Sequence, residues 1–169
     1  MQGETLRKLS LLLIAALITT FAWTAPPPPA EAAVQTRVTA AVSLSTAYAR
    51  ILADTNAARA AAGLPVLKAD PALNTIAQSC SETQARNNAM AHCTGYHTRY
   101  PKGWTWAAEN VAAGYSYDKV VAAWLNSPGH RANILKVGAT HLGIGYAVSA
   151  TGKTYFTQNF ASYPASVRR

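Results

Sequence analysis

The sequence predicts an α+β fold with its helices first and a strand hairpin last. Two stretches in the first half repeat apolar residues at helical spacing, and one stretch near the end alternates large apolar with small residues, as a strand does. The chain lacks the repeated strand–helix alternation that predicts a doubly wound parallel sheet, and it contains no internal repeat.

Residues 1–32 have the features of a secretory signal peptide. Arg7 and Lys8 precede an uncharged apolar run, residues 9–23, which is shorter than the roughly 20 residues that a membrane span requires. Small residues that follow offer cleavage points, of which residues 30–33 fit the small-x-small rule best. An uncleaved N-terminal anchor is the alternative. We expect a secreted, extracellular chain with no membrane span after cleavage.

The rest of the chain is predicted to be one domain. Pro26 to Pro29 cannot continue a helix, so residues 33–39 are predicted to be a linker. Residues 40–163 have a normal domain size and can bury a core, and residues 164–169 form a C-terminal tail. We expect a monomer.

The first two helices have clear boundaries in the sequence. Residues 43–62 are rich in Ala, Leu and Ile, and Gly63 follows as a C-terminal cap. Asp70 can accept from the free amides of a first helical turn, and Pro71 suits the first helical position. This second helix should run to about Asn88.

The second half is less regular. Residues 89–108 have no periodicity and predict a long loop. A third helix is expected from Asp118 to Asn126, then a break at Ser127-Pro128-Gly129 and a short helical turn over residues 130–135. A strand is expected over 142–149 and a returning strand over 154–160, joined by a turn at Gly152.

The charge and the cysteines limit the partners. The formal net charge of +8 is unchanged without residues 1–32, which hold two basic and two acidic side chains. A basic surface favours anionic partners such as wall polymers or lipid head groups, but no nucleic-acid motif is present. Cys80 and Cys93 favour a disulfide in an exported chain, with two buried free thiols as the alternative.

Two segments could carry chemistry. Glu109 stands in an otherwise uncharged, mostly apolar run, residues 107–114. It needs a partner there or an opening to a cleft, because an isolated buried charge is costly; the alternative is a Glu that locks a loop through backbone amides. His130 follows the Pro128-Gly129 bend, where it is either a ligand or a residue that bonds the backbone.

Taken together, these segments resemble the CAP superfamily (cysteine-rich secretory, antigen 5 and pathogenesis-related-1 proteins), most closely its bacterial SCP-like branch. The similarity runs from about Leu52 to Phe160, and the block from Trp124 to Leu135 is its most specific part. The segments that carry it are 56–59, 63–67, 70–73, 90–92, 108–112, 124–135, 143–146 and 155–160.

This resemblance implies a three-layer α-β-α sandwich with a central antiparallel sheet, and further strands near residues 110–113 and in the preceding loop. It also implies a shared cleft for His92, Glu109 and His130. The family's second acidic position falls on Ser127, and Ala108 replaces its usual glycine. Two imidazoles and one carboxylate can still hold a divalent metal, with Zn²⁺ preferred over Ca²⁺. His97 and His141 have no family match and are expected to be loop and surface histidines.

The resemblance implies a non-catalytic extracellular binding module, whose ligand is a lipid, a sterol or a cell-wall component. The alternative is a metal-assisted hydrolase of peptides or wall polymers, in which bound water is activated or Glu109 acts as base. Catalytic residues stay unassigned, because Ser127 is better explained as a helix-ending residue than as a nucleophile. A purely structural role is the third hypothesis. In that case the aromatic residues of the cleft loops would only pack within the fold and would not contact a ligand.

Overall fold

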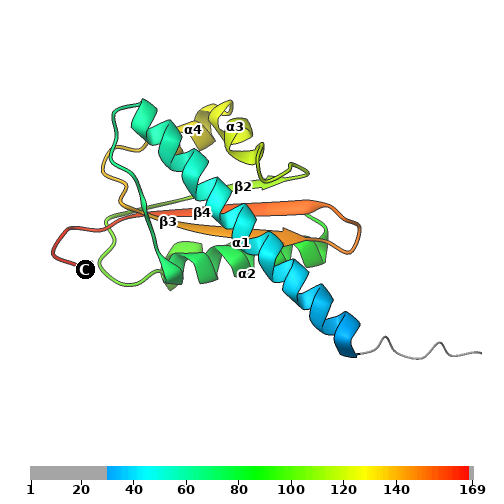
Figure 1. Ribbon diagram of the computed structural model, residues 1–169. Helices are drawn as coiled ribbons and strands as arrows, with labels where there is room; N and C mark the ends of the chain where they lie inside the picture. Colours follow the sequence, from blue (N-terminus) through cyan, green and yellow to red (C-terminus); the bar gives the residue numbers. More distant parts are fainter. Residues whose placement is uncertain (1–29, 168–169) are drawn as a thin grey trace, which may run out of the picture.

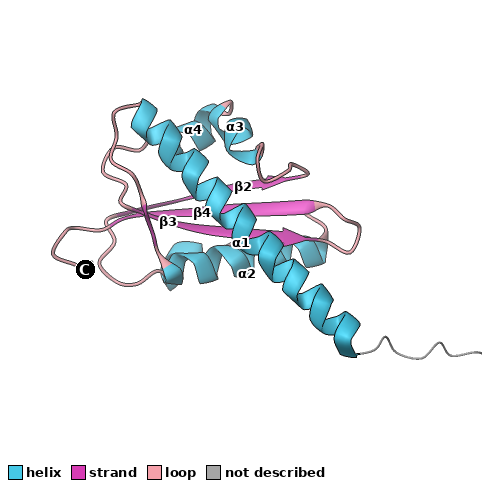
Figure 2. Ribbon diagram, viewed as in Figure 1, coloured by secondary structure: helices cyan, strands magenta, loops and turns pink. Residues whose placement is uncertain are grey.

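The computed structural model describes the backbone of residues 30–167 and the side chains of residues 44–167. The predicted signal peptide lies outside this range except for residues 30–32. Within the range, a sheet is covered by helices on both faces (Figure 1, Figure 2), so the predicted α+β class and three-layer sandwich are confirmed. The helices are α1 (Ala30–Ala61), α2 (Pro71–Asn87), α3 (Val120–Leu125) and α4 (Pro128–Ile134), with a 3₁₀ turn η1 (Tyr96–Arg99).

The sheet has the strand order β1-β3-β4-β2. Its strands are β1 (Lys68–Ala69), β2 (Trp106–Ala113), β3 (His141–Val148) and β4 (Thr154–Ser162). The three long strands pair antiparallel, as predicted, but the two-residue β1 pairs parallel with β3 and makes the sheet mixed. Helices α1, α3 and α4 pack on one face, and α2 packs on the other.

Helix α1 begins earlier than expected. Residues 33–39, predicted to be a linker, are helical and belong to α1. The helix ends before Gly63, which takes a left-handed conformation with φ of 70° as expected for a C-terminal cap. No helix in the described part of the chain combines the length and apolarity that a bilayer crossing requires.

Helix α2 begins and ends where the sequence predicts. Asp70 Oδ1 accepts from the backbone amides of Ala72 and Leu73, and Asn88 closes the helix in a left-handed conformation. The helix lies directly against β3. A Cβ added at Gly143 or Gly145 would come within 2.2 or 2.1 Å of α2 backbone atoms, so only glycine fits at these positions. The glycines of the alternating strand therefore set the distance between α2 and the sheet.

The second half departs in two places from what the residue pattern predicts. Strand β2 starts at Trp106, inside the loop expected from that pattern, as the family resemblance implied, and η1 forms another part of the loop. Pro128 occupies the first helical turn of α4, so the Ser127-Pro128-Gly129 segment begins a helix where we expected only a break. The predicted α3 and the final hairpin are confirmed, with end points shifted by one or two residues.

Two apolar cores flank the sheet, and β4, one of its two inner strands, is polar at its middle. Thr157, Gln158 and Asn159 of β4 are all fully buried. They alternate between the two faces of the sheet, so each face receives polar side chains that need partners. The larger core includes Ile51, Val120, Trp124, Leu142, Phe156 and Phe160, and the smaller one, beside α2, includes Leu73, Ile76, Tyr100 and Tyr163.

Candidate functional site

Glu109 lies in the middle of β2 with its side chain only 1% exposed. The backbone amide of Cys93 donates to Oε1 at 2.9 Å, and Nδ1 of His92 lies 2.9 Å from the same oxygen. Asn159, its register partner on β4, donates its side-chain amide to Oε2 at 3.2 Å and accepts from the Ala77 amide. The carboxyl group thus receives donors from two segments, the loop of His92 and Cys93 and strand β4.

Burial raises the pKa of Glu109 above its ordinary value of 4.5. The hydrogen bonds from the Cys93 amide and His92, and the charges of His92 and Arg99, lower the pKa but do not cancel the effect of burial. Because a carboxylate only accepts, the contact with His92 requires a proton on Nδ1. That tautomer leaves Nε2 of His92 with its lone pair free for a ligand.

The predicted disulfide is confirmed: Cys80 of α2 is bonded to Cys93 in the loop that carries His92. It ties that loop to α2 next to Glu109, whose Oε2 lies 3.7 Å from Cys80 Sγ. This is a contact and not a hydrogen bond, because a disulfide sulfur carries no hydrogen. In the described residues, only the sulfurs of this bridge and Glu109 form a group of three ligand atoms within 4.8 Å of one another. A disulfide lacks the thiolates that bind metals, so this group is not a metal site in the oxidised protein.

Asn110 holds the other histidine segment. Its side-chain amide donates to the backbone oxygen of His130 at 3.2 Å, and Asn133 donates to Asn110 Oδ1 at 2.9 Å. Successive strand residues point to opposite faces, so Glu109 holds the His92 loop on the α2 side while Asn110 holds α4 on the other side. The sequence analysis missed Asn110, although its position beside Glu109 in an apolar run was a usable signal.

His92 and His130 are near enough for the charge of one to affect the other, but no hydrogen bond joins them. The side chain of His92 is 62% exposed, and His130 is half-buried in the first turn of α4. Burial, followed by the charge of His92, lowers the pKa of His130 below 6.5. The lowered pKa favours the neutral form of the His130 ring at pH 7. The structure joins His92 to Glu109, but it does not place all three side chains in one group with ligand atoms within 4.8 Å.

The other predicted histidines differ from each other. His97 is exposed in η1, with its ring edge-on to Tyr96 and Trp104, as expected for a loop histidine. His141 is buried, only 6% exposed, which corrects the expectation of a surface position. It starts β3 with its ring edge-on to Tyr163. Ser127 is the N-cap residue of α4, and its side chain makes no capping hydrogen bond.

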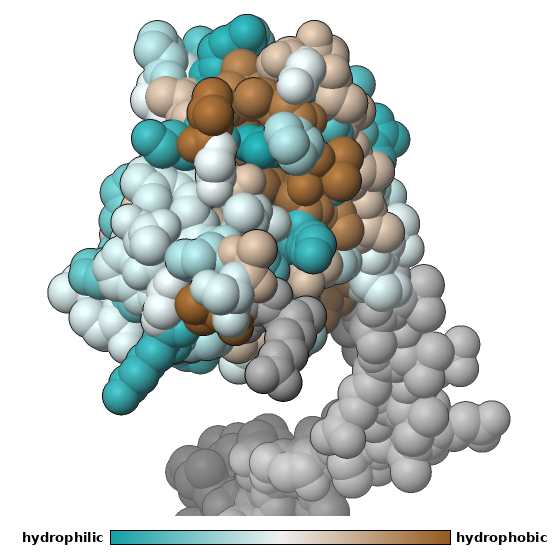
Figure 3. Space-filling model, turned by 90° about the vertical axis from the view of Figure 1, so that its left-hand side faces the viewer, coloured by the Kyte–Doolittle hydropathy of each residue, from teal (hydrophilic) through white to brown (hydrophobic). Residues whose placement is uncertain are grey.

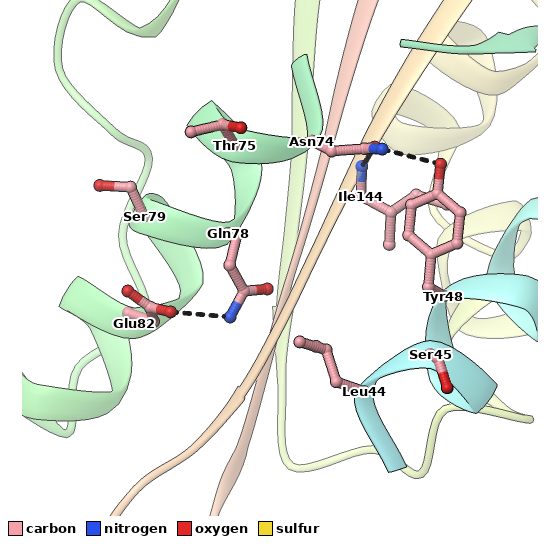
Figure 4. Close-up of a pocket in the computed structure, with 9 residues that line it drawn as sticks. All are labelled: Leu44, Ser45, Tyr48, Asn74, Thr75, Gln78, Ser79, Glu82 and Ile144. Carbon is pink, nitrogen blue, oxygen red and sulfur yellow. Dashed lines mark hydrogen bonds between the residues drawn. The ribbon is translucent and has the colours of Figure 1, made fainter. Parts of the chain in front are cut away.

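Two of the hollows lined by α2 bear on binding. One, of about 420 Å³, is lined by His92, the Cys80–Cys93 bridge, Thr94 and Arg99, among others. The larger, of about 670 Å³, is a groove between α1 and α2 over β3, to which Leu44, Tyr48 and Ile144 contribute apolar surface (Figure 4). The sequence analysis did not predict this groove, because its walls come from three separate elements.

The family assignment follows from a match that spans most of the domain. A family model described as "CAP: Cysteine-rich secretory protein family" matches residues 52–160. This chain belongs to the CAP family. Among its CAP relatives, the YkwD protein of Bacillus subtilis is 34% identical over 146 residues, which are 81% of this chain and 56% of YkwD. The chain thus spans little more than half of that longer relative.

Solved structures support the CAP fold. An outer surface protein of Borrelia burgdorferi superposes with a TM-score of 0.65 at 19% identity, over 70% of this chain and 94% of that one. An extracellular SCP-domain protein of Bacillus anthracis superposes with a TM-score of 0.53 at 33% identity, over 64% of this chain and 37% of that one.

Proposed function

We propose that this CAP protein is secreted and acts outside the cell as a binding module. Its site, at His92 and His130 beside β2, would hold a divalent metal or a small ligand. One contact carries the proposal: the buried carboxyl of Glu109 fixes Nδ1 of the exposed His92. A carboxylate that orients a histidine in this way presents its Nε2 to an ion, as is common in protein metal sites.

Zn²⁺ is the metal that these residues fit best. Imidazole nitrogens are preferred zinc ligands, and the lowered pKa of His130 keeps its ring neutral, as binding requires. We propose His92 and His130 as the ligands, with Glu109 orienting His92 or completing the set after a small shift. A bound ion would supply Lewis acidity. Ser127 adds no negative charge, so Ca²⁺ should bind more weakly.

Calorimetric titration of the full chain with Zn²⁺ tests this proposal. His92→Ala or His130→Ala should abolish tight binding, and Glu109→Gln should weaken it by about 10–100-fold through loss of ring orientation. His97→Ala is the matched control, because His97 is exposed on the same loop segment and lies outside the proposed set. Unchanged binding in the His92→Ala/His130→Ala double variant would remove the metal from the proposal.

For the ligand we propose a lipid, a sterol or a cell-wall component. The groove between α1 and α2 supports an apolar ligand, because it joins apolar walls to a polar rim. A fluorescent fatty acid, a sterol and a muropeptide mixture can be titrated into the full chain. Leu44→Asp should abolish the signal of an apolar ligand, whereas the exposed Thr94→Ala should not. Wild-type protein that binds none of the three would contradict this ligand class.

A hydrolase is the second candidate, and the raised pKa of Glu109 favours it. A carboxyl group with a raised pKa beside an exposed histidine suits general acid–base chemistry. Incubation with casein and with peptidoglycan, with and without chelator, separates the two functions. Cleavage that is lost in Glu109→Gln would establish the enzyme. No cleavage with intact Zn²⁺ binding would favour the binding module.

A further inference from the structure

Two loops at one end of the molecule are fixed by a single buried guanidinium. Arg59 of α1 is 0% exposed, and its guanidinium donates to four backbone oxygens. The acceptors are Pro65 at 2.8 Å, Ile134 at 2.8 Å, Lys136 at 3.0 Å and Ala139 at 3.3 Å. Residues 64–67 and 134–139 are therefore held side by side, so that binding there would cost little ordering entropy.

These loops present apolar side chains to solvent. Val137 is 76% exposed and Val66 is 60% exposed, the two highest values among the large apolar side chains of the described residues. Their neighbours in sequence turn backbone oxygens inward to Arg59. Figure 3 shows apolar surface gathered over the upper part of this end of the molecule, broken and bordered by hydrophilic residues.

The charge around the two valines is positive. Lys68 lines the same shallow pocket as Val66, and Lys136 precedes Val137. Residues 62–69 and 131–141 contain no Asp or Glu. The ammonium group of Lys136 lies 5.7 Å from the centre of the half-buried Trp106 ring, a pairing that suits the boundary between water and lipid.

We propose that this end of the molecule docks on the surface of a bilayer that carries anionic head groups. Val66 and Val137 would enter the boundary of the acyl region, and Lys68 and Lys136 would lie at the phosphates. A soluble polyanion would use the lysines but leave the valines in water. A second copy of the chain would bring the same lysines face to face. The patch uses neither His92 nor His130, so it stands or falls independently of the proposed function.

Hydrogen exchange of the full chain on vesicles tests the proposal. The apolar residues 9–23 can bind vesicles in every variant, so total binding would not report on the patch. Hydrogen exchange is used because it reports protection segment by segment. With vesicles of phosphatidylglycerol and phosphatidylcholine, exchange should slow in residues 64–67 and 134–139 and stay unchanged in the 149–153 hairpin. Equal protection by pure phosphatidylcholine, no protection at all, or equal protection by soluble polyphosphate would each overturn the proposal.

A pair of variants separates the patch from general stickiness. Val66→Ser/Val137→Ser should lose the protection, because it removes both apolar contacts. Val148→Ser is the matched control, since Val148 is 50% exposed at the opposite end of β3. Both variants change exposed side chains, and circular dichroism checks that each is folded. Protection that persists in the double variant, or that is also lost in Val148→Ser, would contradict the role of the two valines.

Discussion

At the scale of single residues, Glu109 links the stability of the protein to its candidate site. Its pKa is raised in the folded chain, chiefly by burial, so the folded state binds a proton more readily than the unfolded state does. The stability that depends on this group is therefore greatest below its ordinary pKa of 4.5. It falls as the pH rises through the higher folded value. Ionising Glu109, which the contact with His92 uses, therefore lowers the free energy of unfolding.

Glu109→Gln should flatten this dependence, because a glutamine cannot titrate. Thermal unfolding of the full chain across pH 4 to 8 measures it, with the melting temperature of the wild type falling more than that of the variant as the pH rises above about 4.5. Glu82→Gln is the control, because Glu82 is exposed. Parallel curves for wild type and Glu109→Gln would contradict the assignment.

At the scale of elements, the sequence predicts those whose ends carry local signals. Helix α2 has Asp70 and Pro71 at its start, and the structure confirms both of its ends. The residue pattern alone did not predict strand β2. Both faces of this strand are covered, so most of its side chains are buried, and its alanines show no alternation of apolar and polar residues. Glu109 was recognised by its isolation in an apolar run. Asn110 was missed, because its contacts with α4 depend on the tertiary structure.

Because α2 lies so close to β3, adding one methyl group to a glycine of β3 should strongly destabilise the fold. Gly145→Ala should destabilise the fold by about 3 kcal/mol, because its Cβ would lie 2.1 Å from Ala77 O and the helix would have to move. Gly129→Ala is the matched control, since a Cβ at that position would meet nothing within 4 Å. Urea unfolding measures both. A similar midpoint for the two variants would contradict the close packing.

The disulfide should matter for both stability and binding. Replacing Cys80 and Cys93 by Ser opens a loop with a sequence separation of 13 and should cost about 3 kcal/mol of stability. It should also weaken Zn²⁺ binding, because the loop that keeps His92 against Glu109 is no longer tied to α2. Calorimetry below the melting temperature separates the two effects. Zn²⁺ affinity equal to that of the wild type would show that the loop is held by other contacts.

At the scale of the whole molecule, α2 takes the place of a missing strand. β1 pairs only with His141 and Leu142, which leaves the rest of the β3 edge without a strand partner. Asn74 Oδ1 accepts from the Ile144 amide, and Gln78 both accepts from the Tyr146 amide and donates to its backbone oxygen. Four helical residues rise about 6 Å and two strand residues about 6.7 Å, so the spacings match. Covered edges resist pairing between molecules.

Asn74→Ala/Gln78→Ala should therefore associate more strongly than the wild type does. Light scattering after size-exclusion chromatography measures the mass of each at several concentrations. Thr75→Ala is the control on the same helix, because the exposed Thr75 side chain bonds only within α2. A double variant that remains monomeric and as stable as the wild type would mean that these amides do not protect the edge.

The neighbouring positions of Glu109 and Asn110 make the site sensitive to the length of β2. Inserting one residue just before this pair would turn both side chains over, sending the acid toward α4 and the amide toward the disulfide. Both histidine segments would lose their anchors at once, although no side chain had been replaced. An insertion of two residues would restore the facing and shift the pair only along the strand.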